Sequence, residues 1–147
     1  MKHLVLGEPN LWPGGGAFSR KIAQATEDDY VAHDHDDLVR WSRAEGLGIL
    51  AALLSISSPQ GVHRAATSLV AGSNPTWDAQ LLALTMSRTV IFGEASLPDA
   101  DAERLPDEGV HVEIVPDAGH LMPWENPAGV ASALRRALAL TVPAKSS

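Results

Sequence analysis

The residues best suited to chemistry lie between positions 115 and 127, where the chain reads Val-Pro-Asp-Ala-Gly-His-Leu-Met-Pro-Trp-Glu-Asn-Pro. His120 follows an apolar, strand-like run, and imidazole is the side chain that exchanges protons near neutral pH. Gly119 lets the backbone turn and approach a neighbouring group closely. Catalytic groups of α/β sheets gather at the carboxyl ends of the strands, which is where this histidine falls. The sequence therefore indicates a proton-transfer site at His120, with a structural loop histidine as the alternative.

The elements that must position this histidine follow from the apolar pattern. Short runs of β-branched and other apolar residues predict three buried strands: His3–Leu6, Thr89–Gly93 and Val110–Val115. Helical spacing, cap residues and prolines predict several short helices over residues 17–72, and further helices over 78–86, over 99–105 and from Asn126-Pro127 onwards. This alternation implies parallel strands joined by right-handed crossovers, so the predicted fold class is α/β.

The segment around His120 resembles the C-terminal histidine segment of α/β-hydrolases, which has a strand, then Gly-His-x-x-x-x-Glu-x-Pro, then an amphipathic helix. Thr89–Gly93 with Glu94-Ala95-Ser96 is similar to the strand that often presents that family's acid. Leu4–Leu11 with Gly14–Arg20 is similar to the sixth strand opening into a helical cap. The resemblance implies a partial α/β-hydrolase fold with three C-terminal parallel strands and flanking helices. It would form one domain over residues 1–147, with residues 17–73 as a helical cap insert.

By this resemblance His120 is the general base, which takes the proton of a nucleophile or activates the hydrolytic water. Many members carry an aspartate three residues after the glycine that ends the penultimate strand, but Ser96 occupies that position here and cannot carry the charge. Other members use a carboxylate just after the sixth strand, and Glu8 occupies that place. A solvated turn residue is the alternative for Glu8. Asp99 and Asp101 are fallback acids, although a short surface helix also explains them.

The nucleophile of the family has no counterpart in this sequence. It lies on a strained strand-to-helix turn, typically Gly-x-Ser-x-Gly or an aspartate variant, and neither pattern occurs. Gly72-Ser73 follows a helical segment, so it is interpreted as a turn. In the family's order the elbow and the oxyanion hole would precede Met1, which implies a truncated enzyme. We therefore expect no hydrolysis by a triad mechanism from this chain alone.

Two classes of function remain open at this point. The first is hydrolysis of an ester-type or related small-molecule substrate by a nucleophile–histidine–acid mechanism, completed by an N-terminal half that is encoded upstream or supplied by another chain. The second is a non-catalytic fragment or partner-binding module, because residues 3–6 would present an unpaired strand edge for strand addition or self-association. A hydrolase fold used only for binding is a third option, since fold does not fix function.

Composition removes several other classes of function. The net charge is −7, and the eleven basic residues are scattered along the sequence. Both features argue against nucleic acid and against an anionic membrane surface as partners. The absence of cysteine excludes disulfides, cysteine-ligated metals and a cysteine nucleophile. The longest apolar run, residues 47–56, is far shorter than the roughly 20 residues of a membrane helix. With no export signal at the start of the chain, the expected location is the cytoplasm.

We expect neither a cofactor nor a metal. His33-Asp34-His35-Asp36-Asp37 resembles a metal cluster in composition, but side chains two residues apart do not face each other on a helix. This segment is predicted to be a solvated helix start. Gly14-Gly15-Gly16 lacks both the lysine of a phosphate-binding loop and the spacing of a dinucleotide fingerprint, so it is predicted to be a hinge.

Overall fold

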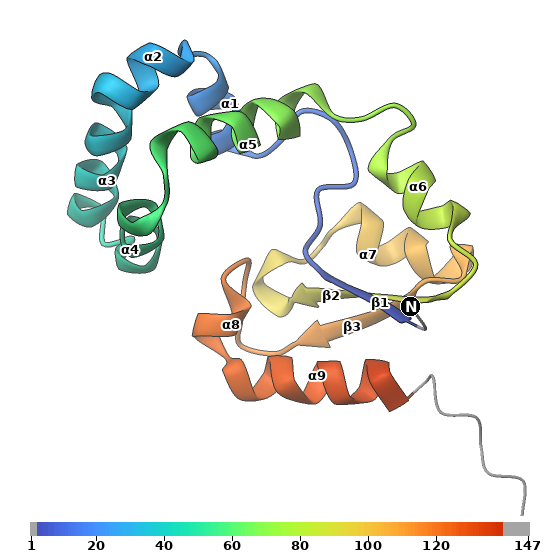
Figure 1. Cartoon of the computed structure of the whole chain (residues 1–147). Coiled ribbons are helices and arrows are strands. Elements are labelled where there is room, and N and C mark those ends of the chain that lie inside the picture. Colours follow the sequence, from blue (N-terminus) through green and yellow to red (C-terminus); the bar gives the residue numbers. More distant parts are fainter. Residues whose placement is uncertain (1–2, 140–147) are drawn as a thin grey trace, which may run out of the picture. The chain divides into compact units, whose positions relative to one another are not determined.

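The computed structural model describes residues 3–139, and the chain divides into two compact units. One unit contains the residues up to Pro9 and those from Asp78 onwards, and it holds the sheet. The other unit, Asn10–Trp77, is helical. Figure 1 follows the chain through both units. The predicted cap region, residues 17–73, falls within the helical unit, and its action as a cap stays a prediction.

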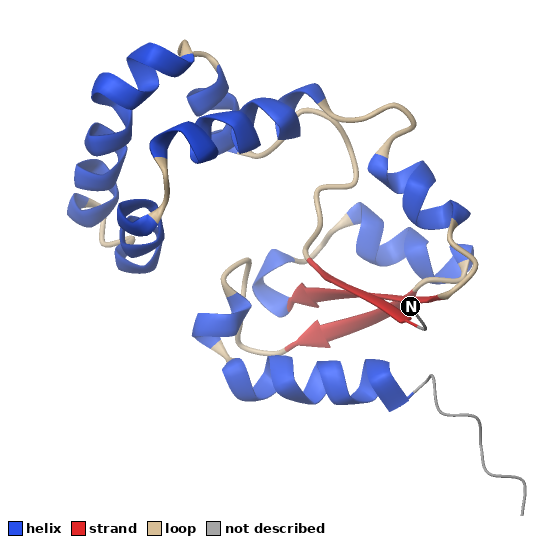
Figure 2. Ribbon diagram, in the orientation of Figure 1, coloured by secondary structure: helices blue, strands red, loops and turns tan. Residues whose placement is uncertain are grey.

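The sheet has three strands, namely β1 (His3–Gly7), β2 (Ser87–Gly93) and β3 (His111–Val115). Their order in the sheet is β1-β2-β3 and both pairings are parallel (Figure 2). Val90, Ile91 and Phe92 of the central strand are all less than 5% exposed because β2 has a neighbour on each side. These observations confirm the α/β class and the three parallel strands expected from the sequence.

Short helices cover both sides of the sheet. They are α6 (Trp77–Ala83), α7 (Ala100–Arg104), α8 (Met122–Glu125) and α9 (Pro127–Ala139). Figure 1 shows α7 and α9 on opposite sides of the strands. On the α9 side, apolar side chains from all three strands, α8 and α9 pack into one core that includes Val5, Ile91, Val115, Met122 and Ala133. This core fixes the carboxyl ends of the strands relative to one another.

Helix α6 ends earlier than the sequence suggests. The apolar spacing predicts a helix over residues 78–86, but the helix stops at Ala83. The guanidinium of Arg88 donates to the carbonyl oxygens of Leu81, at 3.0 Å, and of Leu82, at 2.8 Å. The Leu81 carbonyl also accepts the amide of Leu84, at 3.3 Å, so the cation on the following strand adds to the backbone bonding that ends the helix.

The helical unit contains α1 (Ala17–Ala23), α2 (Glu27–Asp29), a π-helix (Tyr30–Asp34), α3 (His35–Ala44), α4 (Gly48–Ile56) and α5 (Pro59–Ala71). Two of these helices begin at side-chain caps: Thr26 accepts the amide of Asp29, and Ser58 accepts the amide of Gly61. Gly72 ends α5 with φ of 74°, a conformation that favours glycine. No helix within residues 3–139 has the length and apolar character needed to cross a membrane.

The prediction of a solvated helix start at residues 33–37 is wrong for His35, whose residue surface is only 5% exposed. Its Nε2 donates to the carbonyl oxygen of Leu54, at 3.1 Å, because that oxygen can only accept. Nδ1 is then the acceptor for the Tyr30 hydroxyl, at 3.2 Å. His35 is therefore a core residue. In the described part of the chain, no three His, Asp or Glu side chains are placed to hold a metal ion.

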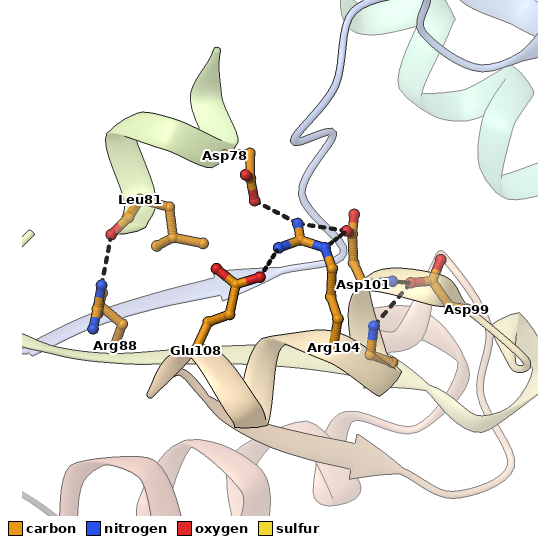
Figure 3. A network of polar contacts seen from close by, with 8 residues as sticks. Asp78, Leu81, Arg88, Asp99, Asp101, Arg104 and Glu108 are labelled. Carbon is orange, nitrogen blue, oxygen red and sulfur yellow. Dashed lines mark hydrogen bonds and ion pairs between the residues drawn. The ribbon is translucent and has the colours of Figure 1, made fainter. Parts of the chain in front are cut away.

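One guanidinium ties α6 to the segment after β2. Arg104 binds Asp78, Asp101 at 2.7 Å and Glu108 at 3.0 Å (Figure 3). Burial opposes the charge of Arg104, but hydrogen bonds to the three carboxylates outweigh burial and raise its pKa. Asp99 in the same figure accepts the amides of Asp101 and Ala102 and so caps α7.

We expect Arg104→Met to lower the free energy of unfolding by about 2–3 kcal/mol. The methionine keeps the apolar stem but leaves Asp78, whose side chain is only 10% exposed, without its cation. Urea unfolding followed by circular dichroism measures the change. Arg135→Met, at an exposed position of α9, is the control and is expected to have no measurable effect. Equal stabilities for the two variants would contradict the structural role of Arg104.

Candidate functional site

The structure brings His120 and Glu8 together although they lie 112 residues apart in the sequence. The Nδ1 atom of His120 lies 2.8 Å from Oε2 of Glu8. Glu8 comes directly after β1, and His120 lies on the loop that follows β3. Because the strands are parallel, their carboxyl ends meet at the same edge of the sheet. The carboxylate side chain is 10% exposed, whereas the imidazole is 71% exposed.

The backbone at Glu8 directs its side chain across the end of β2. Its φ of 38° lies in the left-handed region, which non-glycine residues rarely adopt. The amide of Glu8 donates to the carbonyl oxygen of Ile91, at 2.9 Å, and so continues the pairing of β1 with β2. Oε1 of Glu8 accepts the amide of Gly93, at 2.8 Å. One carboxylate oxygen is therefore bound to the sheet and the other to the histidine.

The surroundings of Glu8 favour its ionised form. Burial by itself raises the pKa of this carboxyl group, but hydrogen bonds from the Ser96 hydroxyl, the Gly93 amide and His120 outweigh burial and lower it. Ser96 occupies the position at which many α/β-hydrolases carry an aspartate. Here that residue does not carry the charge; it donates a hydrogen bond to the carboxylate that does.

The pairing defines the state of the imidazole. An ionised carboxylate only accepts hydrogen bonds, so Nδ1 of His120 carries the hydrogen in the pair. In the neutral ring Nε2 then keeps its lone pair. Within residues 3–139 no protein group hydrogen-bonds to Nε2 of this largely exposed ring. The arrangement is chemically competent to take a proton at Nε2 and to stabilise the resulting cation through Glu8.

The loop that carries His120 packs directly against the end of β2. A Cβ atom at Gly93 would lie 2.5 Å from the carbonyl oxygens of Ala118 and of Gly119. The carbonyl oxygen of Ala118 also accepts the amide of Ala95, at 2.9 Å. Only glycine fits at position 93, and this close approach brings the loop within reach of Glu8.

The other candidates from the sequence lie elsewhere. Asp99 caps α7 and Asp101 binds Arg104, so each fallback acid has a structural role in place of a contact with His120. Ser73, the nearest serine to a nucleophile motif, donates to the carbonyl oxygen of Pro75, at 2.8 Å. Sequence reasoning missed the donors Gly93 and Ser96. The sequence signal for this contact is Gly93 itself, because a glycine at the end of a strand marks a place where another backbone segment approaches closely.

A search of solved structures finds a thermophilic esterase from Thermogutta terrifontis, in a malate-bound form, with a TM-score of 0.67. The match covers 95% of this chain and 56% of the esterase, at 21% identity. The chain has an α/β-hydrolase-like fold. MGS-M2, an α/β-hydrolase enzyme from a Medee basin deep-sea metagenome library, also matches, with a TM-score of 0.57 and 14% identity over 99% of this chain and 59% of its own.

NosK from Streptomyces actuosus also matches this chain, with a TM-score of 0.52 and 23% identity over 95% of this chain and 59% of NosK. The chain therefore spans 56–59% of the length of these structures. At these identities the similarity shows the fold alone. No protein-family model and no curated protein sequence matches the chain.

Proposed function

We propose that this chain provides the histidine–carboxylate pair of an α/β-hydrolase that cleaves an ester-type or related small-molecule substrate. The observation that carries the proposal is the 2.8 Å contact between His120 and Glu8, with Nε2 free to act. Nε2 takes the hydroxyl proton of the nucleophile as its oxygen attacks the ester carbonyl, and Glu8 stabilises the imidazolium. The same proton then passes to the departing alkoxide. Water, activated in turn by Nε2, releases the acid and restores the nucleophile.

The nucleophile and the oxyanion hole are proposed to come from polypeptide outside these 147 residues. Support comes from the sheet: β1 is its terminal strand in the described chain, and Val5 and Leu6 stay half-buried while their partners in β2, Thr89 and Val90, are buried. A further parallel strand beside β1 would complete the burial of these side chains. Its carboxyl end would lie beside Glu8, from which a turn could present a nucleophile to Nε2.

The second candidate function is a partner-binding module without catalysis, and the same strand edge favours it. Its backbone groups could pair with a strand of another protein or of a second copy. The two proposals differ at the imidazole, because a module needs no defined protonation state at His120, whereas a general base does. They also differ in the coding DNA upstream of Met1, where an in-frame Gly-x-Ser-x-Gly or Gly-x-Asp-x-Gly would favour the enzyme.

We expect Glu8→Gln to change the tautomer populations of the His120 ring from one form to a mixture of two. Nitrogen-15 NMR of the neutral ring is expected to show the hydrogen on Nδ1 in the unchanged protein and a mixture in the variant, because a glutamine amide can donate as well as accept. Asp99→Asn is the control and should leave the tautomer unchanged, since Asp99 only caps α7. A tautomer that responds to Asp99→Asn and not to Glu8→Gln would refute the assignment of the acid.

The unchanged protein and Glu8→Gln together also test the lowered pKa of Glu8. Because folding lowers that pKa, the ionised carboxylate stabilises the fold above the ordinary pKa of a glutamate in the unfolded chain, 4.5. Its contribution is lost as the pH falls through the lower pKa of the folded state. The stability difference between the unchanged protein and Glu8→Gln is therefore expected at neutral pH and should vanish under strongly acidic conditions. Urea unfolding over a range of pH measures it.

A further inference from the structure

The short loop between β3 and His120, residues 116–119, is held through five of its backbone groups. The contacts join Asn126 Nδ2 to Pro116 O at 2.9 Å, Asp117 N to Glu94 Oε2 at 3.1 Å, Ala95 N to Ala118 O at 2.9 Å, Gly119 N to Glu125 Oε2 at 2.6 Å and Met122 N to Gly119 O at 3.1 Å. Two of these acceptors are glutamate side chains on the surface. The loop therefore depends on side chains, as well as on the sheet, for its conformation.

This loop also contains strain that must be offset. Asp117 has φ of 51°, in the left-handed region. A non-glycine residue there costs of order 1 kcal/mol or more and persists only where its surroundings hold it. The contact nearest to the histidine is the one from Glu125 to Gly119, the residue directly before His120. Its position fixes the peptide from which the imidazole extends.

Helix stability does not explain a glutamate at position 125. Glu125 is the last residue of the one-turn helix α8 and also belongs to its first turn, so the helix dipole gives no net preference for an anion there. No apolar core contact explains it either, since the residue is exposed. Its side chain accepts the amide of Gly119, six residues earlier in the sequence. This hydrogen bond joins the end of α8 to the loop that precedes the helix. A charge-assisted hydrogen bond of this kind is stronger than a neutral one.

We propose that Glu125 is a positioning residue for His120. Its carboxylate holds the Gly119 amide, and this keeps the imidazole oriented so that Nδ1 remains hydrogen-bonded to Glu8. This inference rests on the proposed function, because the orientation of the ring matters most where the ring acts as a base. Glu125 acts through the backbone and does not touch the reacting atoms. Glu94 holds the amide of Asp117 on the other side of Ala118 and supports the strained residue itself.

The test uses NMR of the whole chain with Glu125→Ala and Glu125→Gln. We expect Glu125→Ala to speed hydrogen exchange of the Gly119 amide about 10-fold and to turn the single Nδ1–H tautomer of His120 into a mixture. Glu125→Gln should restore both readouts, because its amide oxygen still accepts from Gly119. Glu103→Ala removes an exposed glutamate from α7 and serves as the control, with no expected change.

Two results would overturn the inference: a Glu125→Ala protein in which exchange at Gly119 and the tautomer match the unchanged chain, or a Glu125→Gln protein that behaves like Glu125→Ala. Failure of the proposed function gives a different pattern. In that case Glu8→Gln would leave the His120 tautomer as it was, while exchange at Gly119 would still report on Glu125.

Discussion

Replacing His120 by alanine in a completed enzyme is expected to lower kcat/KM for an activated ester by about 10³-fold or more, with the folded structure retained. The chain can be completed by fusing it to the part of the Thermogutta terrifontis esterase that lies outside the matched 56%. The rate falls because the substitution removes the base proposed to take the proton of the nucleophile. The imidazole is 71% exposed, so its loss should leave the packing intact.

Release of p-nitrophenol measures this effect, and circular dichroism confirms that the fusion protein is folded. His111→Ala is the matched control, because His111 lies on β3 but binds Glu113, at 2.9 Å, in place of Glu8. This change should leave the rate within a few-fold of the unchanged fusion. The 147-residue chain alone is expected to hydrolyse no ester by a triad mechanism. Robust turnover by the chain alone, abolished by His120→Ala, would show that the nucleophile lies within it.

Replacing Gly93 by alanine is expected to lower the free energy of unfolding by about 1–3 kcal/mol and to separate His120 from Glu8. The new methyl group would lie 2.5 Å from two carbonyl oxygens of the His120 loop. Both oxygens belong to the backbone, so neither can rotate away as a side chain would. The loop must therefore move, and the 2.8 Å contact between the imidazole and the carboxylate is expected to break.

Gly7→Ala is the matched control for this prediction. Gly7 also lies at the carboxyl end of a strand, one residue before Glu8, but a methyl group there would find its nearest neighbour at 3.9 Å, in Met122. Its stability should change by less than about 0.5 kcal/mol. Urea unfolding and the His120 tautomer are the measurements. A Gly93→Ala protein as stable as Gly7→Ala, with the tautomer unchanged, would rule out the close approach.

Local patterns in the sequence determine the elements and one half of the site. β-Branched runs predict all three strands, and the serine and threonine caps predict helix starts, because both signals depend on neighbours within a few residues. The glycine before His120 and the strand before that glycine place the imidazole at a strand end. Two local predictions failed. Helix α6 stops early because Arg88 binds its last carbonyls, and His35 is buried because Tyr30 and Leu54 satisfy its ring.

Only the tertiary structure decides which carboxylate reaches His120. The sequence leaves Glu8, Asp99 and Asp101 open, since nothing in their local context gives the distance to a residue more than 100 positions away. The parallel register sets Gly7 beside Ile91 and Gly93 beside Val115, so that Glu8 and the His120 loop converge on Gly93. Strand identity is a property of short segments, whereas this convergence depends on packing the whole sheet. The sequence by itself therefore determines a histidine at a strand end, and the fold selects the carboxylate that it contacts.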